Sequence, residues 1–194
     1  RQMCIRDSYE SLESRKAELE ELILALAAPY QQELAILQTA PGISSDFTAI
    51  GIISEIGTNM EAFPSAKHLC SWAGLAPTNN ESAGKKKSVR VSKAGCYIKP
   101  LLVQCANAVV KSSKHPEMRN RYLRLKKRRG HKKAIIAIAR MLLTALYHML
   151  KNGENYNAEL YRKSDLPPVD REITVEQAIL IARNQGYKIK SATA

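Results

Sequence analysis

The stretch AIIAIARMLLTALYHML, residues 134–150, is the longest apolar run of the chain and decides its fold class. It carries Arg140 and His148, and it is barely long enough to cross a bilayer. We therefore predict a buried helix of a helical domain rather than a membrane span. Since no segment of the chain shows a convincing alternation of apolar and polar residues, as strands do, the sequence predicts a mainly α fold.

A second long helix is predicted over residues 9–37. Leu12, Leu19 and Leu26 are spaced seven residues apart, and a companion apolar row lies four residues further on. Pro29 predicts a kink or break in this helix. Coiled-coil pairing and simple packing of a connecting helix both explain the pattern.

The segment APGI at residues 40–43 forms a sharp turn between this helix and an apolar helix over 50–56 that ends at Gly57. A helix, a Pro-Gly-Ile turn and a second helix resemble a helix-hairpin-helix element, whose turn can bind a phosphate through backbone N–H groups. A plain helical hairpin is the alternative, because Ser44 replaces the usual second glycine.

The charge of the chain is strongly positive and concentrated. The net charge is +12, and residues 84–133 hold 17 Lys and Arg against one acid, Glu117. A patch of this kind favours a nucleic-acid partner, while no basic amphipathic helix with aromatic residues on its apolar face points to a membrane. The four cysteines lack zinc-site spacing and no signal peptide is visible, so we expect reduced thiols, no metal site in this chain and a cytoplasmic location.

The segment ESAGKKKSVRVSKAG, residues 81–95, is expected to be a polar loop and the place for chemistry on a phosphodiester. A serine can act as a nucleophile where neighbouring cations neutralise the electrophile. Ser82, Ser88 and Ser92 are the candidates, and Ser92 better fits a cap or turn before the next helix. The nearby cations predicted to contact phosphates are Lys85, Lys86, Lys87, Arg90 and Lys93.

A second cationic cluster lies on a predicted helix after His115 and at the start of the buried helix. We predict that it contacts nucleic acid without reading bases, a solvated charged face being the alternative. Tyr122 within it, and Trp72 further upstream, are expected to pack in the interior rather than stack on bases. The cluster comprises Arg119, Arg121, Arg124, Lys126, Lys127, Arg128, Arg129, Lys132 and Lys133.

An ordered set of motifs then resembles a known family. The motifs are APGI at 40–43, EIG at 55–57, FPSAK at 63–67, WAGLAP at 72–77, ESAG at 81–84, VSKAG at 91–95 and RGHKKA at 129–134. Together they resemble the C-terminal Tnp domain of the one-ten/one-sixteen/nine-oh-two family of bacterial insertion-sequence transposases, the DEDD transposases. One departure is CYIKP at 96–100, where many relatives carry arginines.

The resemblance implies an RNA-guided serine recombinase acting on DNA as a homo-oligomer, a dimer or tetramer. It implies a RuvC-like domain with four magnesium-binding acids, then a coiled coil, then the Tnp domain, whose nucleophile corresponds to Ser82. The resulting division is an assembly artefact at 1–8, a coiled-coil-like helix at 9–37, the Tnp domain at 38–153 and an extension at 154–194. The RuvC-like domain is not in this chain, so we expect a fragment that is inactive alone.

Two other hypotheses remain open from the sequence. The chain could be a helix-hairpin-helix module that binds DNA without chemistry. In that case Ser82→Ala in a full-length parent would cause no loss of function. It could also be an assembly protein that oligomerises through residues 9–37.

Overall fold

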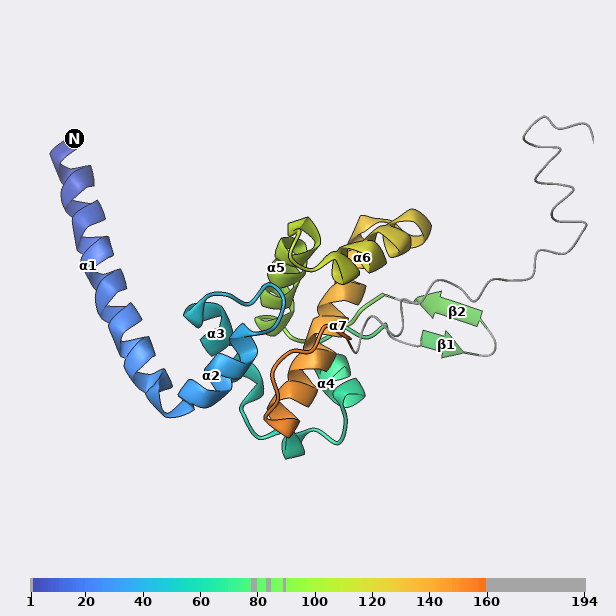
Figure 1. Ribbon diagram of the computed structural model, residues 1–194. Coiled ribbons are helices and arrows are strands. Elements are labelled where there is room, and N and C mark those ends of the chain that lie inside the picture. The colour runs from blue at the N-terminus through green and yellow to red at the C-terminus, as the bar shows by residue number, and fades with distance from the viewer. Residues whose placement is uncertain (1, 78–79, 83–84, 89, 160–194) are drawn as a thin grey trace, which may run out of the picture. The chain divides into compact units, whose positions relative to one another are not determined.

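The computed structural model describes residues 2–77, 80–82, 85–88 and 90–159, and for residues 2, 3, 80–82 and 85–88 only the backbone. The described part is mainly helical, as the sequence predicts (Figure 1). The chain divides into one unit at residues 1–156 and another at 157–194. The elements of the first unit are, in order, α1 (Gln2–Ala27), η1 (Ala28–Tyr30), α2 (Gln31–Gln38), α3 (Asp46–Ile56), η2 (Met60–Ala62), α4 (Ala66–Trp72), β1 (Asn80–Ser82), β2 (Lys85–Ser88), α5 (Ile98–Lys111), α6 (Pro116–Arg129) and α7 (His131–Asn152).

Helix α7 is the centre of the fold, and it contains the apolar run at 134–150. It packs against α2, α4, α5 and α6, and Ile138, Leu142, Leu143 and Leu146 are fully buried. By length and composition α7 is the one helix of the described residues that could cross a membrane, but most of its apolar window is buried by other parts of this protein. The prediction of a buried core helix is therefore confirmed.

The N-terminal helix breaks where Pro29 lies. The 3₁₀ turn η1 separates α1 from α2, because proline cannot continue the α-helical hydrogen-bond ladder. Helix α1 begins seven residues earlier than Tyr9, at Gln2. Within that added part, Arg6 pairs with Glu10 at 2.8 Å and the Ser8 hydroxyl donates to the Cys4 carbonyl, contacts that favour a continuous helix.

The turn between α2 and α3 is packed against α5. Pro41 and Ile43 are buried, and Gly42 has φ +79°. A Cβ on Gly42 would lie 2.6 Å from the Val109 side chain and 2.7 Å from the Cys105 carbonyl oxygen. The glycine is thus required by close packing as well as by its backbone conformation.

The cysteines are all free thiols, as expected, but they occupy two kinds of position. Cys70 and Cys105 are buried, whereas Cys4 and Cys96 are exposed. Burial raises the pKa of Cys105 to about 11, because desolvation disfavours the thiolate. Cys105 is therefore an inert packing residue at neutral pH.

Candidate nucleic-acid interface

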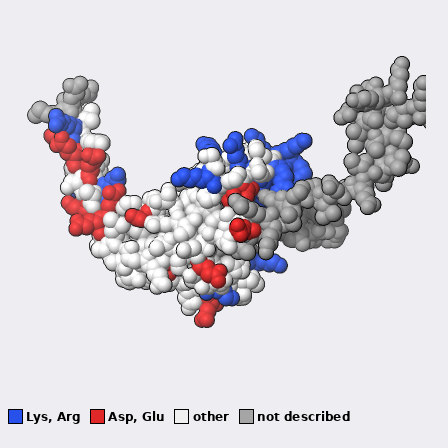
Figure 2. Space-filling view, viewed as in Figure 1, with Lys and Arg blue, Asp and Glu red and all other residues white. Residues whose placement is uncertain are grey.

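Helix α6 turns a narrow apolar stripe towards the domain and leaves most of its cations at the surface. Met118 and Tyr122, one helical turn apart, are buried against the rest of the domain. Figure 2 shows Lys and Arg side chains gathered on one face of the molecule, in the region of α6 in Figure 1. Arg121 is half-buried; the exposed predicted cations are Arg119, Arg124, Lys126, Lys127, Arg128 and Arg129 on α6 and Lys132 and Lys133 at the start of α7. We call these nine residues the α6 cationic face.

The order of charges along α6 suits the helix dipole. Glu117 lies in the first turn and four bases, Lys126 to Arg129, lie in the last turn. Glu117 is only 9% exposed, and its Oε1 lies 3.4 Å from Nδ1 of His115 without a hydrogen-bond partner. The one acid of residues 84–133 is thus turned inward, and it does not offset the positive charge at the surface.

Tyr122 joins α6 to α7 beneath this face. Its hydroxyl lies 2.8 Å from Nδ1 of His131, and the two rings meet edge to face at 6.0 Å. The Lys126 amine lies 5.8 Å from the centre of the Tyr122 ring. Because Tyr122 is only 8% exposed, its ring packs and is not available for stacking on a base, as predicted.

The expected loop at 81–95 contains a short antiparallel hairpin. Ser82 pairs with Lys85, Glu81 with Lys86 and Asn80 with Ser88, with a bulge between Asn80 and Glu81. These strands were not predicted from the sequence, because runs of Lys, Glu and Ser have low β propensity. The register places Ser82 at the turn end of the hairpin, directly across from Lys85, and Ser88 at the opposite end. Residues 83, 84 and 89 of the expected loop lie outside the described part.

The base of the hairpin is held by two glycines that cross at close range. A Cβ on Gly74 would lie 2.5 Å from the Ala94 carbonyl oxygen, and one on Gly95 would lie 2.3 Å from that of Ala73. Both glycines have φ near +65°, which favours glycine in its own right. We call this crossing the glycine clasp. An isolated bridge between Pro77 and Val91 continues the pairing towards the hairpin.

Ser92 and Lys99 complete the base of the hairpin. The Ser92 hydroxyl accepts a hydrogen bond from the Ala94 N–H at 3.3 Å, which confirms its expected place in a turn. The half-buried Lys99 donates to the Ser92 carbonyl at 2.5 Å. Lys99 belongs to the segment CYIKP at 96–100, and its amine binds backbone. Lys93 and Arg90, two of the predicted phosphate contacts, are exposed beside this turn.

Trp72 lies at the surface, so the prediction that it packs in the interior is wrong. It is 44% exposed, and its ring meets Phe63 at 5.7 Å with a tilt of 58°. The reason is the short length of α4, which buries Leu69 and Cys70 against α7 and leaves Trp72 on another side. Sequence spacing within so short a helix did not settle which side faces the core.

The histidines and acids offer no catalytic constellation within the described residues. Nδ1 of His68 lies 2.9 Å from the Ser65 hydroxyl, His115 faces Glu117, His131 contacts Tyr122, and the His148 ring packs on Tyr147. No group of three or more His, Cys, Asp or Glu in this part of the chain could hold a metal ion. The described residues of this chain therefore do not form a magnesium site.

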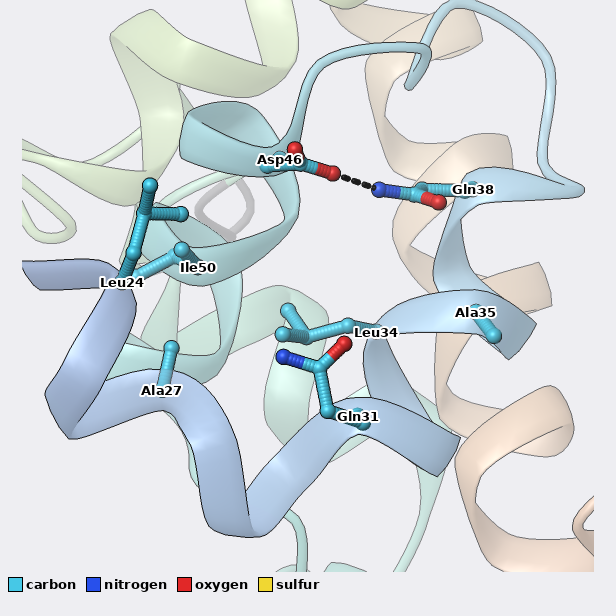
Figure 3. Close-up of a pocket in the computed structure, with 8 residues that line it drawn as sticks. All are labelled: Leu24, Ala27, Gln31, Leu34, Ala35, Gln38, Asp46 and Ile50. Atoms are coloured by element: carbon cyan, nitrogen blue, oxygen red, sulfur yellow. Dashed lines mark hydrogen bonds between the residues drawn. The ribbon is translucent and has the colours of Figure 1, made fainter.

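A pocket lies between the end of α1, α2 and α3 (Figure 3). Leu24, Leu34 and Ile50 supply its apolar wall. Its only carboxylate, Asp46, accepts a hydrogen bond from the Gln38 amide. A single carboxylate with an amide partner provides no acid–base pair, so the pocket is structural.

The geometry defines a helical domain with a cationic face and a clasped, lysine-rich hairpin. Comparison with known proteins gives the class. A family model described as "Transposase IS116/IS110/IS902 family" matches residues 34–123. That span includes the α2–α3 turn, the glycine clasp, the hairpin and most of α6, and over it this chain is similar to that transposase family.

Individual relatives agree. The chain is 27% identical to the "Insertion element IS110 uncharacterized 43.6 kDa protein" of Streptomyces coelicolor over 80% of its own length and 38% of the relative. It is 29% identical to pilin gene-inverting proteins of Moraxella bovis and Moraxella lacunata, over 66% of its length and 39% of theirs. The chain thus spans about two fifths of the length of these relatives. No solved structure matches it.

Proposed function

We propose that this chain is the DNA-holding, nucleophile-bearing part of an insertion-sequence transposase that carries out DNA transposition or recombination in the bacterial cytoplasm. The α6 cationic face carries the proposal. It gathers nine cations over α6 and the start of α7, eight of them exposed, and the only acid of residues 84–133 is buried. Such a face suits the phosphate backbone, and the similarity to the transposase family and to gene-inverting proteins supports DNA as the partner.

The α6 cationic face would bind DNA without selecting sequence. Lysine and arginine contacts to phosphates position a duplex, while base selection needs a different set of side chains in a groove. We expect sequence selection to come from a guide RNA, as the family resemblance implies.

Binding can be tested directly on the 194-residue chain. Fluorescence anisotropy with labelled duplexes of unrelated sequence, titrated across salt concentrations, should give similar affinities and a steep loss of affinity with salt. Absence of binding at low salt would overturn the proposal.

Ser82 is the nucleophile in this proposal. Its Oγ would lose its proton and attack phosphorus, the bond from phosphorus to the deoxyribose oxygen would break, and that oxygen would take up a proton and leave as a hydroxyl, so that a phosphoserine link remains. Two observations support it: the family motif ESAG at 81–84, and the hairpin register that sets Ser82 across from Lys85. Lys85, Lys86 and Lys87 follow Ser82 closely in the sequence, and their ammonium groups would stabilise the phosphate charge that develops during the attack.

We further propose that magnesium is held by acidic residues outside this chain, which would make the catalytic site composite. This would leave the chain able to bind DNA but unable to complete strand exchange. Strand exchange by the purified 194-residue chain would contradict it.

The nucleophile is tested by a covalent trap. The segment is joined to the N-terminal part of a full-length relative and supplied with magnesium, guide RNA and labelled target DNA. A protein–DNA adduct on a denaturing gel should disappear in Ser82→Ala and persist in Ser88→Ala and Ser92→Ala. An adduct that survives Ser82→Ala places the nucleophile elsewhere.

A DNA-binding module without chemistry is the second candidate. The observation that favours it is the set of four histidines, each engaged by a structural partner and none free to act as a base. In that case a recombination-competent chimera would form no adduct through this segment, and Ser82→Ala would leave recombination unchanged.

We propose that α1 mediates homo-oligomerisation. Leu12, Leu19 and Leu26 are 65%, 58% and 68% exposed, so the heptad row has no partner within the described part of the chain. Light scattering should show a dimer or tetramer that dissociates when the three leucines are replaced by serine. A monomeric parent chain would exclude this role.

A further inference from the structure

We propose that Trp72 is a stacking platform for an unpaired base of single-stranded DNA, placed at the base of the Ser82 hairpin. This deepens the proposed function, since it assigns a second subsite to the DNA-holding part. It concerns the one tryptophan of the chain, a residue with 44% of its surface exposed. An aromatic ring that faces solvent beside cations is the chemistry by which proteins hold unpaired bases.

The Trp72 ring is fixed rather than free to rotate into the solvent. One side of it packs on Phe63 at 5.7 Å. Phe63 is itself held to the core, because its carbonyl accepts a hydrogen bond from the Tyr147 hydroxyl of α7 at 3.1 Å. A ring oriented before DNA arrives loses little conformational freedom on binding, which is what a stacking surface requires.

The backbone also fixes Trp72 relative to the hairpin. Trp72 is the last residue of α4, and the next two residues, Ala73 and Gly74, form one side of the glycine clasp. The other side of the clasp is formed by Ala94 and Gly95, which follow the hairpin in the sequence. The segments that lead to and from the hairpin therefore cross directly after Trp72.

Charge at this crossing favours nucleic acid over an apolar protein partner. Lys93 is exposed two residues before Gly95, and Lys67 is exposed on α4 itself. The Lys99 amine lies beside Gly74, where a Cβ would approach it to 2.8 Å. The aromatic ring would stack on a base, and its basic neighbours would attract the phosphates on either side of that base.

The site has a clear function in strand exchange. During strand exchange, a base next to the scissile phosphate would leave the duplex as the backbone enters the hairpin. Stacking on Trp72 would compensate the lost base stacking and hold the strand in place. The α6 cationic face would hold the adjoining duplex.

The test uses the intrinsic fluorescence of the intact chain, because its only tryptophan is the proposed platform. Labelled oligonucleotides of equal length, one single-stranded and one fully paired, are titrated while anisotropy reports binding and tryptophan emission reports stacking. We expect both to bind and only the single strand to quench the emission. Quenching by neither bound DNA would overturn the platform and leave the proposed function standing, whereas absence of any binding would overturn both.

Variants separate stacking from charge. Trp72→Ala should weaken binding of the single strand on the order of tenfold and leave duplex binding unchanged, and Trp72→Phe should retain most of the affinity. Phe47→Ala is the matched control, since Phe47 is 41% exposed on α3, and it should change neither affinity. Circular dichroism checks folding of each variant.

Equal affinity of Trp72→Ala and the parent for single-stranded DNA would overturn the inference. So would a single-stranded RNA of the same sequence that quenches while the DNA does not, because the platform would then belong to the RNA.

Discussion

Helices α6 and α7 are neighbours in sequence, joined only by Gly130, and they have opposite roles. α7 buries ten residues and forms the core, while α6 buries three and presents cations to the solvent. Both are well-formed helices, so the backbone does not distinguish them. The difference lies in the side chains. The buried side chains of α7 stabilise the fold, whereas most of those of α6 are exposed and can contact a ligand. This predicts that variants of the α7 core lower stability, whereas variants of the α6 cationic face lower binding.

The largest effect is expected in the core of α7. Leu142 is fully buried, so Leu142→Ala should lower the free energy of unfolding by about 2–5 kcal/mol through lost burial and a cavity. Leu123→Ala on α6 is the control, because Leu123 is 48% exposed and should cost less than about 0.5 kcal/mol. Urea unfolding followed by circular dichroism measures both. Equal losses would break the comparison.

Substitutions at Gly95 and Gly130 compare the crowded glycine clasp with the open junction between α6 and α7. Gly130→Ala should cost roughly 1–3 kcal/mol, since φ +80° with ψ 168° is a conformation that essentially only glycine adopts, although no atom lies within 4 Å of the new Cβ. Gly95→Ala should cost roughly 1–3 kcal/mol more, because its Cβ would meet the Ala73 carbonyl oxygen at 2.3 Å. The same unfolding curves measure the difference. Similar costs would mean that the clasp is not rigid.

The core was predictable from the sequence because burial follows from a long apolar pattern. The run at 134–150 became α7, and Pro29 broke the N-terminal helix where expected. Segments of this length carry enough apolar side chains for one face to prevail.

The candidate site was predictable in composition but not in arrangement. The cations of α6 and the serines of the hairpin were identified as residue types, yet the strands at 80–82 and 85–88 and the exposure of Trp72 were not. The glycine clasp joins residues about twenty positions apart, and only the folded backbone brings them together. Local patterns do not contain that contact. Glycines in the motifs WAGLAP and VSKAG were the one available signal.

The role of α6 is tested by removing charge without touching the core. Arg128→Ala with Arg129→Ala should leave stability unchanged, since both residues are exposed. Duplex affinity should fall, and the slope of log affinity against log salt should drop by roughly 1.8 if each arginine neutralises one phosphate. Arg15→Ala on α1 is the control and should not alter the slope. An unchanged slope in the double variant would move the DNA to another face.

The smallest effect is expected at the contact that joins the two helices. Tyr122→Phe removes the hydroxyl that lies 2.8 Å from Nδ1 of His131 and keeps the buried ring. The loss should be about 1 kcal/mol of unfolding free energy, the usual net value of one hydrogen bond. Duplex affinity should stay within about twofold at low salt, because no cation is removed. A loss of binding with little loss of stability would instead show that Tyr122 sets the position of the α6 cationic face. The division of roles between the buried core and the α6 cationic face would then fail, since one buried residue would serve both fold and ligand. Hydrogen exchange of the α6 amides distinguishes the two cases: increased exchange in α6 alone indicates a helix that has come loose from α7, and unchanged exchange indicates a hydroxyl that contributes only its own hydrogen bond.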